Sequence, residues 1–300
     1  MPPEWRVRRS TPPSANLPRP LGAHMWATGG VHRALERGAD LGCDVVQVFT
    51  RNPNQWSPKP VSPEQVEACR RVQAETGVRL FAAHDSYLIN LASPAEALRK
   101  QSLAAMHDEL ARADLLGIEW VVTHMGAHMG EGVDRGLERL VDSLDRVVAD
   151  TPKGLAKTAL EVTAGQGTTL GARFEHVAAV LQQVCRAERF GVCLDTCHVH
   201  AAGYQWRGEA AYEALWAEFD SVIGLDLLKL IHANDAKREC GSRVDRHEHL
   251  GKGRIGLATF RRLVRDPRLA HVPIILETPE AETMHRVNLR LLQSMRPPRL

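Results

Sequence analysis

Residues 94–124, PAEALRKQSLAAMHDELARADLLGIEWVVTH, contain the unit that decides the fold. Apolar residues recur at intervals of three and four between Pro94 and Leu116, which predicts an amphipathic helix. The short apolar run from Trp120 to Thr123 then predicts a strand, and His124 follows directly after it. The same order of helical stretch and short apolar run recurs along the chain, which is typical of an α/β protein.

Eight short apolar runs predict eight strands. They cover residues 21–25, 44–49, 78–83, 120–123, 159–162, 192–194, 228–231 and 273–276, with helix-like segments such as 137–148 between them. Eight strand and helix units in about 280 residues fit a (β/α)8 barrel, which commonly has about 250 residues. We therefore predict a single TIM-barrel domain over residues 20–300.

Residues 1–19 differ from the rest of the chain in composition. Five prolines lie there among several arginines, without apolar periodicity. Such a segment cannot bury enough apolar surface to fold, so we expect a disordered arm.

The overall composition limits the function. With 25% charged residues and a formal net charge of +2 over 300 residues, the chain shows no strong charge-driven affinity for nucleic acid. No run approaches the 18 or more apolar residues of a membrane span, and the six cysteines show no paired spacing. We therefore expect a soluble, cytoplasmic protein without a disulfide framework. Its 14 histidines are an unusual supply of imidazole ligands.

The predicted strands end in groups that bind metals. Active sites of TIM barrels form at the carboxyl ends of the strands, and every predicted strand except the second ends in such a group. These groups are His24, His84, His124, Glu161, Asp195 with His198 beyond it, His232 and Glu277. Imidazoles and carboxylates suit zinc, manganese or iron, so the sequence predicts a metal site at this end of the barrel.

Local spacing refines the prediction. If residues 245–249 are extended, Asp245 and His247 point to one side and can bind one ion, whereas Arg246 faces away. His249 shares that side, and we expect it to be a bystander. His24 and His128 are expected to support ligands rather than to bind metal. The cysteines that flank Asp195 are expected to be buried apolar residues.

Six motifs in order resemble those of the endonuclease IV family of apurinic/apyrimidinic (AP) endonucleases, which are xylose isomerase-like TIM barrels. They are residues 84–91 (HDSYLINL), 161–167 (EVTAGQG), 194–198 (LDTCH), 232–237 (HANDAK), 241–247 (GSRVDRH) and 276–278 (LET). The resemblance runs from about Leu21 to the end of the chain and leaves only the arm outside.

The resemblance implies three zinc ions, with manganese or iron as a substitute at one position. The implied ligands are His84, His124 and Glu161 for the first ion; Glu161, Asp195, His232 and Glu277 for the second; and His198, Asp245 and His247 for the third. It also implies hydrolysis of double-stranded DNA on the 5′ side of an abasic site, which leaves a 3′ hydroxyl and a 5′ deoxyribose phosphate, and trimming of blocked 3′ ends. Glu161, which bridges two ions, is the expected catalytic residue that orients the attacking water.

The expected DNA contacts are Tyr87, Leu88, Asn54 and Arg246. Tyr87 and Leu88 match family residues that enter the duplex. Asn54 stands where family members place an arginine, and we expect Arg51 or Trp56 to compensate for the missing guanidinium. Trp26, where small residues are common, is a second departure. We expect the protein to act as a monomer.

Two other classes of function remain open. One is a metal-dependent sugar isomerase or epimerase of the same barrel superfamily, which needs a metal at positions like Glu161, Asp195, His232 and Glu277. The other is a DNA-damage binder whose metals are purely structural. The additional ligands His84, His124, His198, Asp245 and His247 disfavour the first, and the few protein ligands on two of the ions disfavour the second.

Overall fold

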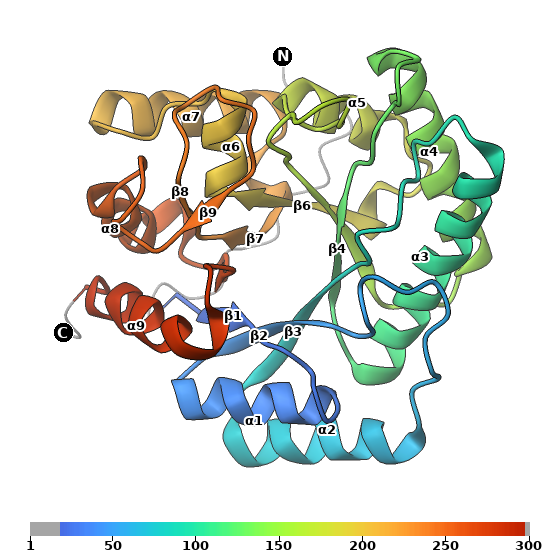
Figure 1. Cartoon of the computed structure of the whole chain (residues 1–300), viewed down its shortest axis with the longest axis horizontal. Helices are drawn as coiled ribbons and strands as arrows, with labels where there is room; N and C mark the ends of the chain where they lie inside the picture. The colour runs from blue at the N-terminus through green and yellow to red at the C-terminus, as the bar shows by residue number, and fades with distance from the viewer. Residues whose placement is uncertain (1–18, 298–300) are drawn as a thin grey trace.

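The computed structural model describes residues 19–297, so residues 1–18 of the predicted arm lie outside it. Within the described range, eight parallel strands close into a barrel in the order β1, β10, β7, β6, β5, β4, β3, β2, and the helices surround them (Figure 1). The strands are β1 (Leu21–His24), β2 (Val45–Phe49), β3 (Arg79–His84), β4 (Trp120–His124), β5 (Lys157–Glu161), β6 (Phe190–Asp195), β7 (Leu228–His232) and β10 (Ile274–Leu276). The predicted TIM barrel is confirmed.

The helices agree with the predicted segments between strands. They are α1 (Val31–Leu41), α2 (Pro63–Thr76), α3 (Glu96–Leu116), α4 (Val133–Asp150), α5 (Phe174–Gln183), α6 (Thr196–Ala202), α7 (Glu209–Val222), α8 (Leu257–Arg265) and α9 (Ala281–Ser294), with short 3-10 turns at Ala187–Arg189, Leu225–Leu227 and Pro267–Leu269. No helix in residues 19–297 combines the length and the apolar character needed to cross a membrane. All six cysteines are free.

Arg19, the last residue of the predicted arm, belongs to the barrel. Its side chain is buried, and its guanidinium donates hydrogen bonds to the carbonyl oxygens of Val272 (2.8 Å) and Leu263. These contacts place the start of the folded domain before residue 20.

A layer of apolar side chains fills the interior of the barrel. It is formed by Val45, Phe81, Ala82, Trp120, Val122, Ala159, Cys193, Leu230 and Ile275, which come from seven of the strands. Because such a layer is close-packed, it supports the polar layer next to it rather than leaving a channel.

The connection between β7 and β10 contains an element that the sequence did not predict. Strands β8 (Asp235–Ala236) and β9 (His247–Glu248) form a small antiparallel sheet. Asp235 is fully buried and accepts hydrogen bonds from the backbone amides of Gly251 (2.9 Å) and Ile255 (2.8 Å). One carboxylate thus organises the segment that carries Asp245 and His247.

Candidate metal centre

The two-residue period of the strands explains how the site is built. Alternate residues of a strand point to the same side. In five strands, and directly after a sixth, the residue two positions after a member of the apolar layer is a histidine or carboxylate at the carboxyl end of the barrel. These residues are His84, His124, Glu161, Asp195, His232 and Glu277. The two-residue period that places apolar side chains in the interior therefore also brings six donor groups together at the carboxyl end of the barrel.

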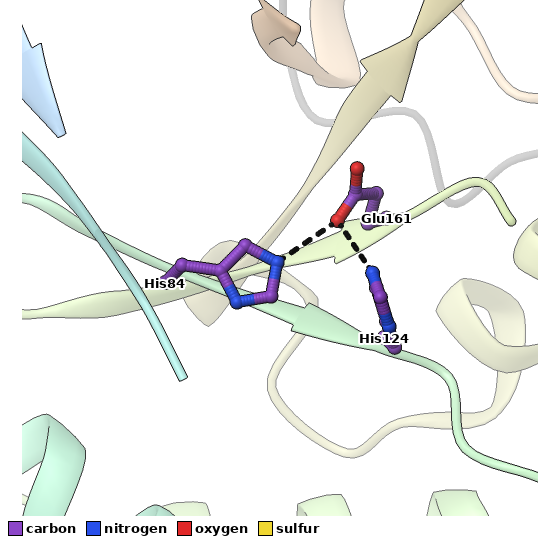
Figure 2. Close-up of side chains that lie close together, drawn as sticks. All are labelled: His84, His124 and Glu161. Atoms are coloured by element: carbon purple, nitrogen blue, oxygen red, sulfur yellow. Dashed lines mark hydrogen bonds and ion pairs between the residues drawn. The ribbon is translucent and has the colours of Figure 1, made fainter. Parts of the chain in front are cut away.

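Glu161 lies at the centre of the cluster and is almost fully buried. Its Oε2 is 3.2 Å from Nε2 of His84 and 3.1 Å from Nε2 of His124. Figure 2 shows how both imidazoles point toward this carboxylate. Its Oε1 is 3.0 Å from Nδ1 of His232 and 3.3 Å from Nδ1 of His198. The two oxygens of one carboxylate therefore face different groups of histidines, as a bridging ligand requires.

Asp195 divides its two oxygens between the fold and the site. It precedes α6, and its Oδ1 accepts hydrogen bonds from the backbone amides of Cys197 (2.6 Å) and His198 (3.0 Å). A carboxylate at this position stabilises the start of a helix. This cap fixes His198 in the first turn of α6 and leaves Oδ2 of Asp195 directed at the site.

Asp245 joins the cluster from the connection between β7 and β10. Its carboxylate oxygens are 3.2 Å from Nε2 of His198 and 3.3 Å from Nε2 of His247. Asp245 and His247 therefore meet on one side of an extended segment, as the alternate spacing predicts. Arg246 is exposed, and Nδ1 of His249 lies 3.2 Å from the side-chain amide of Asn288. His249 thus has a structural partner, in agreement with its expected role as a bystander.

The donor atoms form three groups in which all atoms lie within 4.8 Å of one another. The groups are His84 with His124 and Glu161; Glu161 with Asp195, His232 and Glu277; and His198 with Asp245 and His247. Most of these residues line a pocket of about 240 Å³. Five imidazoles and four carboxylates are a donor set that suits zinc and similar divalent ions, so the residues fit the metals that the resemblance implies.

Two further groups of this kind include a cysteine, Cys193 or Cys197. Cys193 lies in the apolar layer and is fully buried, and burial raises the pKa of its thiol well above the ordinary value. Burial also raises the pKa of Cys197, whose Sγ donates to the carbonyl oxygen of Arg246. Because metals bind the thiolate, these shifts favour the imidazole and carboxylate donors.

The electrostatics of the cluster favour bound cations. Burial alone would raise the pKa of Glu161, but the nearby charges of His232 and His124 hold it well below the usual value. Burial would lower the pKa of His84, but hydrogen bonds with Asp85 and Glu161 raise it well above the usual value. The carboxylate of Glu161 is therefore ionised and requires positive partners, which can be protons on imidazoles or metal ions.

Asp85 and Asn234 support the cluster, although the sequence did not identify them. Nδ1 of His84 lies 3.0 Å from the backbone carbonyl oxygen of Asp85 and 3.5 Å from its carboxylate, which also accepts a hydrogen bond from Oγ1 of Thr123 (2.5 Å). Asn234 donates to Oδ2 of Asp195 (2.6 Å), and its side-chain oxygen accepts from the backbone amide of Glu277 (2.9 Å). Both residues lie within two positions of an expected ligand, which is the signal that could have found them.

The two expected supporting histidines differ in outcome. His24 lies in the pocket, with Nδ1 3.1 Å from Oε1 of Glu277, and is thus beside an expected ligand. The prediction for His128 is wrong. Its Nδ1 accepts hydrogen bonds from the backbone amides of Gly130 (3.2 Å) and Gly132 (3.1 Å), and it therefore orders the loop before α4.

The expected DNA contacts lie on loops at the carboxyl ends of the strands. Tyr87 is 61% exposed, and its ring meets Phe49 edge-on at 5.3 Å between centroids. Leu88 is half-buried and Asn54 is exposed. Oγ of Ser86 donates to the carbonyl oxygen of Pro53 (2.5 Å), which joins the loop carrying Asn54 to the loop carrying Tyr87.

Arg51 is not available to compensate for the missing arginine at position 54. Arg51 is buried, with Nε bonded to Oε1 of Glu109 (2.6 Å), and Trp56 is partly buried against the core. The guanidinium of Arg51 is therefore committed to the fold, whereas compensation by Trp56 stays a prediction. Trp26 likewise packs against the core, and the guanidinium of Arg37 lies 5.2 Å from its ring.

Known proteins with similar sequences belong to one class of TIM barrel. The sequence matches the family described as xylose isomerase-like TIM barrel over residues 35–295, which places the chain in that class of barrels. A probable endonuclease 4 of Chloroflexus aurantiacus is 48% identical over 281 residues, or 93% of this chain and 98% of the relative. The chain belongs to the endonuclease IV family.

Solved structures show the same relationship. The crystal structure of endonuclease IV from Thermus thermophilus has a TM-score of 0.82 and 33% identity, covering 93% of this chain and 98% of the other. A D-tagatose 3-epimerase-like protein has a TM-score of 0.67 at 18% identity, covering 92% and 94%. At that identity the second likeness shows the fold alone.

Proposed function

We propose that this protein is a zinc-dependent AP endonuclease of DNA repair. It acts as a monomer on double-stranded DNA, hydrolyses the phosphodiester 5′ to an abasic site, and leaves a 3′ hydroxyl and a 5′ deoxyribose phosphate. It also trims blocked 3′ ends. The observation that carries the proposal is the convergence of three donor groups around the shared carboxylate of Glu161, in a member of the endonuclease IV family.

The nine donor residues would hold three zinc ions, with manganese or iron as a substitute at one position, in the three groups described above. When bound, such ions lower the pKa of a water to about 7 and stabilise the charge on the attacking and leaving oxygens of the phosphate. The protein must hold the donor side chains in place before DNA binds. Burial and the supporting bonds from Asp85 and Asn234 serve this purpose.

Glu161 is the proposed catalytic residue. Its carboxylate is buried and ionised, and each oxygen faces a different pair of imidazoles. This arrangement orients a negative charge toward the position of the attacking water and prevents the side chain from rotating away. Preorganised groups of this kind need no rearrangement during the reaction.

The proposed DNA contacts are Tyr87, Leu88, Asn54 and Arg246. A nucleotide without a base has lost its stacking and pairing, so it leaves the helix at low cost. Side chains that enter the gap then stabilise the distorted duplex. The exposed ring of Tyr87 at the edge of the pocket suits this role.

The alternatives account for fewer residues. A sugar isomerase or epimerase needs the group around Glu161, Asp195, His232 and Glu277 but has no use for the other five donors. A damage binder with structural metals would favour closed cages of four protein ligands, whereas two of these groups have three members.

Replacing Glu161 tests the proposal. We expect Glu161→Gln to bind duplex DNA containing an abasic analogue and to cleave it at least about 100-fold more slowly, because one preorganised charge is lost. Electrophoresis of end-labelled strands measures cleavage, and fluorescence anisotropy measures binding. Glu138→Gln, on the exposed face of α4, is the matched control. Cleavage by Glu161→Gln at the rate of this control would exclude the proposed role.

A further inference from the structure

Gln47 is a buried polar residue in an otherwise apolar strand. It lies in β2 between Val46 and Val48 and has no exposed surface. It is two positions after Val45 of the apolar layer, so it occupies in β2 the position that donor residues occupy in five other strands and directly after a sixth. A buried amide without hydrogen bonds would cost free energy, so its partners indicate its purpose.

The amide of Gln47 bonds three residues of the site. Its Nε2 donates to Oε1 of Glu277 (2.6 Å) and lies 2.9 Å from Nδ1 of His24. Its Oε1 lies 2.9 Å from Nε2 of His232. These partners come from the barrel strands β1 and β7 and from the residue directly after β10, so one side chain links three parts of the pocket wall.

The chemistry of these groups sets the orientation of the amide. A carboxylate that binds a metal ion is ionised, and Nε2 of Gln47 lies 2.6 Å from Oε1 of Glu277. An ionised carboxylate only accepts hydrogen bonds, so the amide nitrogen of Gln47 must face it. The amide oxygen, which also only accepts, is left for His232. Nε2 of His232 therefore carries a hydrogen.

This bond determines which nitrogen of His232 is free. With the hydrogen on Nε2, the lone pair of the neutral ring lies on Nδ1. Nδ1 is 3.0 Å from Oε1 of Glu161 and 3.1 Å from Oε2 of Glu277, which are two of the three other donors of the same group. In Glu277, the bond from Gln47 holds Oε1 and leaves Oε2 on the side of His232.

We propose that Gln47 is a positioning residue that fixes the ring of His232 with Nδ1 toward the metal and directs Oε2 of Glu277 to the same ion. This inference rests on the proposed function, because it takes His232 and Glu277 as ligands of one divalent cation. Hydrogen bonds from outside the ligand set orient metal-binding histidines, and their loss commonly costs about 10- to 100-fold in metal affinity.

Two variants test the inference. Gln47→Leu and Gln47→Met have similar volume but lack the amide, so they keep the packing of β2 and remove the three hydrogen bonds. Gln73→Leu is the matched control, because Gln73 uses its side-chain oxygen to accept from the backbone amide of Leu80 (2.8 Å), outside the pocket. If the Leu variant fails to fold, the Met variant provides the measurement.

Two readouts distinguish positioning from general stability. Competition with a chelator of known affinity measures zinc binding, and ¹⁵N NMR of labelled imidazoles reports the tautomer of His232 in the zinc-loaded protein. We expect both variants to bind zinc at the position of His232 and Glu277 about 10- to 100-fold less tightly. We also expect His232 to lose its fixed Nε2–H form in these variants. The control is expected to match the unaltered protein in both measurements.

The outcomes separate this inference from the proposed function. If the unaltered protein binds no divalent metal, the proposed function fails. If the unaltered protein binds zinc and the variants bind it equally well, or keep the tautomer of His232, the inference about Gln47 is overturned and the proposed function stands. Failure of both variants to fold would also overturn it, because Gln47 would then serve the core rather than the ligands.

Discussion

Tyr87, a proposed DNA contact, is exposed, whereas the donor residue His84 next to it is buried. Tyr87 is 61% exposed, whereas His84, three positions earlier, is 4% exposed. The two rings lie 6.1 Å apart between centroids, so Tyr87 borders the donor cluster without belonging to it. Its removal should therefore affect the binding of DNA and leave the metal ligands in place.

Tyr87→Ala should weaken binding to a duplex with one abasic analogue by about 10-fold, because stacking of an aromatic side chain on a base contributes about 1–3 kcal/mol. Zinc content should remain that of the unaltered protein. Fluorescence anisotropy and elemental analysis of the same preparation measure the two quantities. An unchanged affinity would show that Tyr87 does not contact the distorted helix.

His285 connects the pocket to the stability of the fold. It lies in α9, lines the pocket and is buried, and burial together with the charge of His24 lowers its pKa to about 4. In the unfolded chain a histidine has a pKa of about 6.5. At pH values between about 4 and about 6.5, His285 is therefore protonated in the unfolded chain but not in the folded protein. Stability is lost as the pH falls from about 6.5 to about 4.

His285→Leu should reduce this sensitivity to acid. The shift corresponds to about 3 kcal/mol of unfolding free energy at most, so the variant should lose correspondingly less stability between pH 6.5 and 4.5. Urea unfolding at several pH values measures the slope. His107→Leu, on α3, is the control. Equal slopes for His285→Leu and the unaltered protein would show that His285 does not contribute.

The residues of the site differ in how far the sequence reveals them. Histidines and carboxylates after apolar runs are conspicuous, and the motifs of a known family group them in the way that the structure brings them together. Gln47 is inside an apolar run, and Asn234 needs its partners Asp195 and Glu277 to be recognised. Supporting residues are defined by contacts across the barrel, which spacing along the chain does not contain.

At the scale of elements, a buried network anchors the loop between β2 and α2. Glu109 of α3 bonds Nε of Arg51 (2.6 Å) and Oγ1 of Thr50 (2.7 Å). Arg112 of the same helix donates to the carbonyl oxygens of Thr50 (2.6 Å) and Lys59 (2.8 Å). Both ends of the loop that carries Asn54 are thus attached to one helix.

Arg51→Met should destabilise the protein by about 3–5 kcal/mol, because it leaves the carboxylate of Glu109 buried without its cation. Urea unfolding measures the loss. Arg33→Met removes the exposed ion pair with Glu36 and should cost well under about 1 kcal/mol. A loss for Arg51→Met as small as that of Arg33→Met would mean that the buried network does not hold the loop.

The barrel strands could be predicted from the sequence, whereas the two-residue strands β8 and β9 could not. All eight barrel strands lie where apolar runs predict them, since each buries both faces between the interior and the helices. Strands β8 and β9 have two residues each, too few for any period, and they depend on the buried carboxylate of Asp235. The interpretation of Arg51 as a DNA contact failed for a related reason, because its partner Glu109 is distant in sequence.

For the molecule as a whole, bound metal would change the electrostatics of the end of the barrel that carries the donor groups. The site contains four carboxylates, Glu161, Asp195, Asp245 and Glu277, which contribute −4 to the formal net charge of +2. Three divalent ions would add about +6, so the site would change from about −4 to about +2. The small net charge of the chain is thus compatible with a DNA partner, and affinity for DNA should depend on metal loading and on salt.

The proposed AP endonuclease activity is tested most directly by measuring cleavage and metal content on one sample. Purified protein is incubated with a duplex that carries a single abasic analogue, before and after removal of metal by a chelator. We expect about three divalent ions per chain, a cut on the 5′ side of the analogue, loss of cutting after metal removal and recovery with zinc. An uncut duplex with about one metal per chain would contradict the account and favour a sugar isomerase or epimerase.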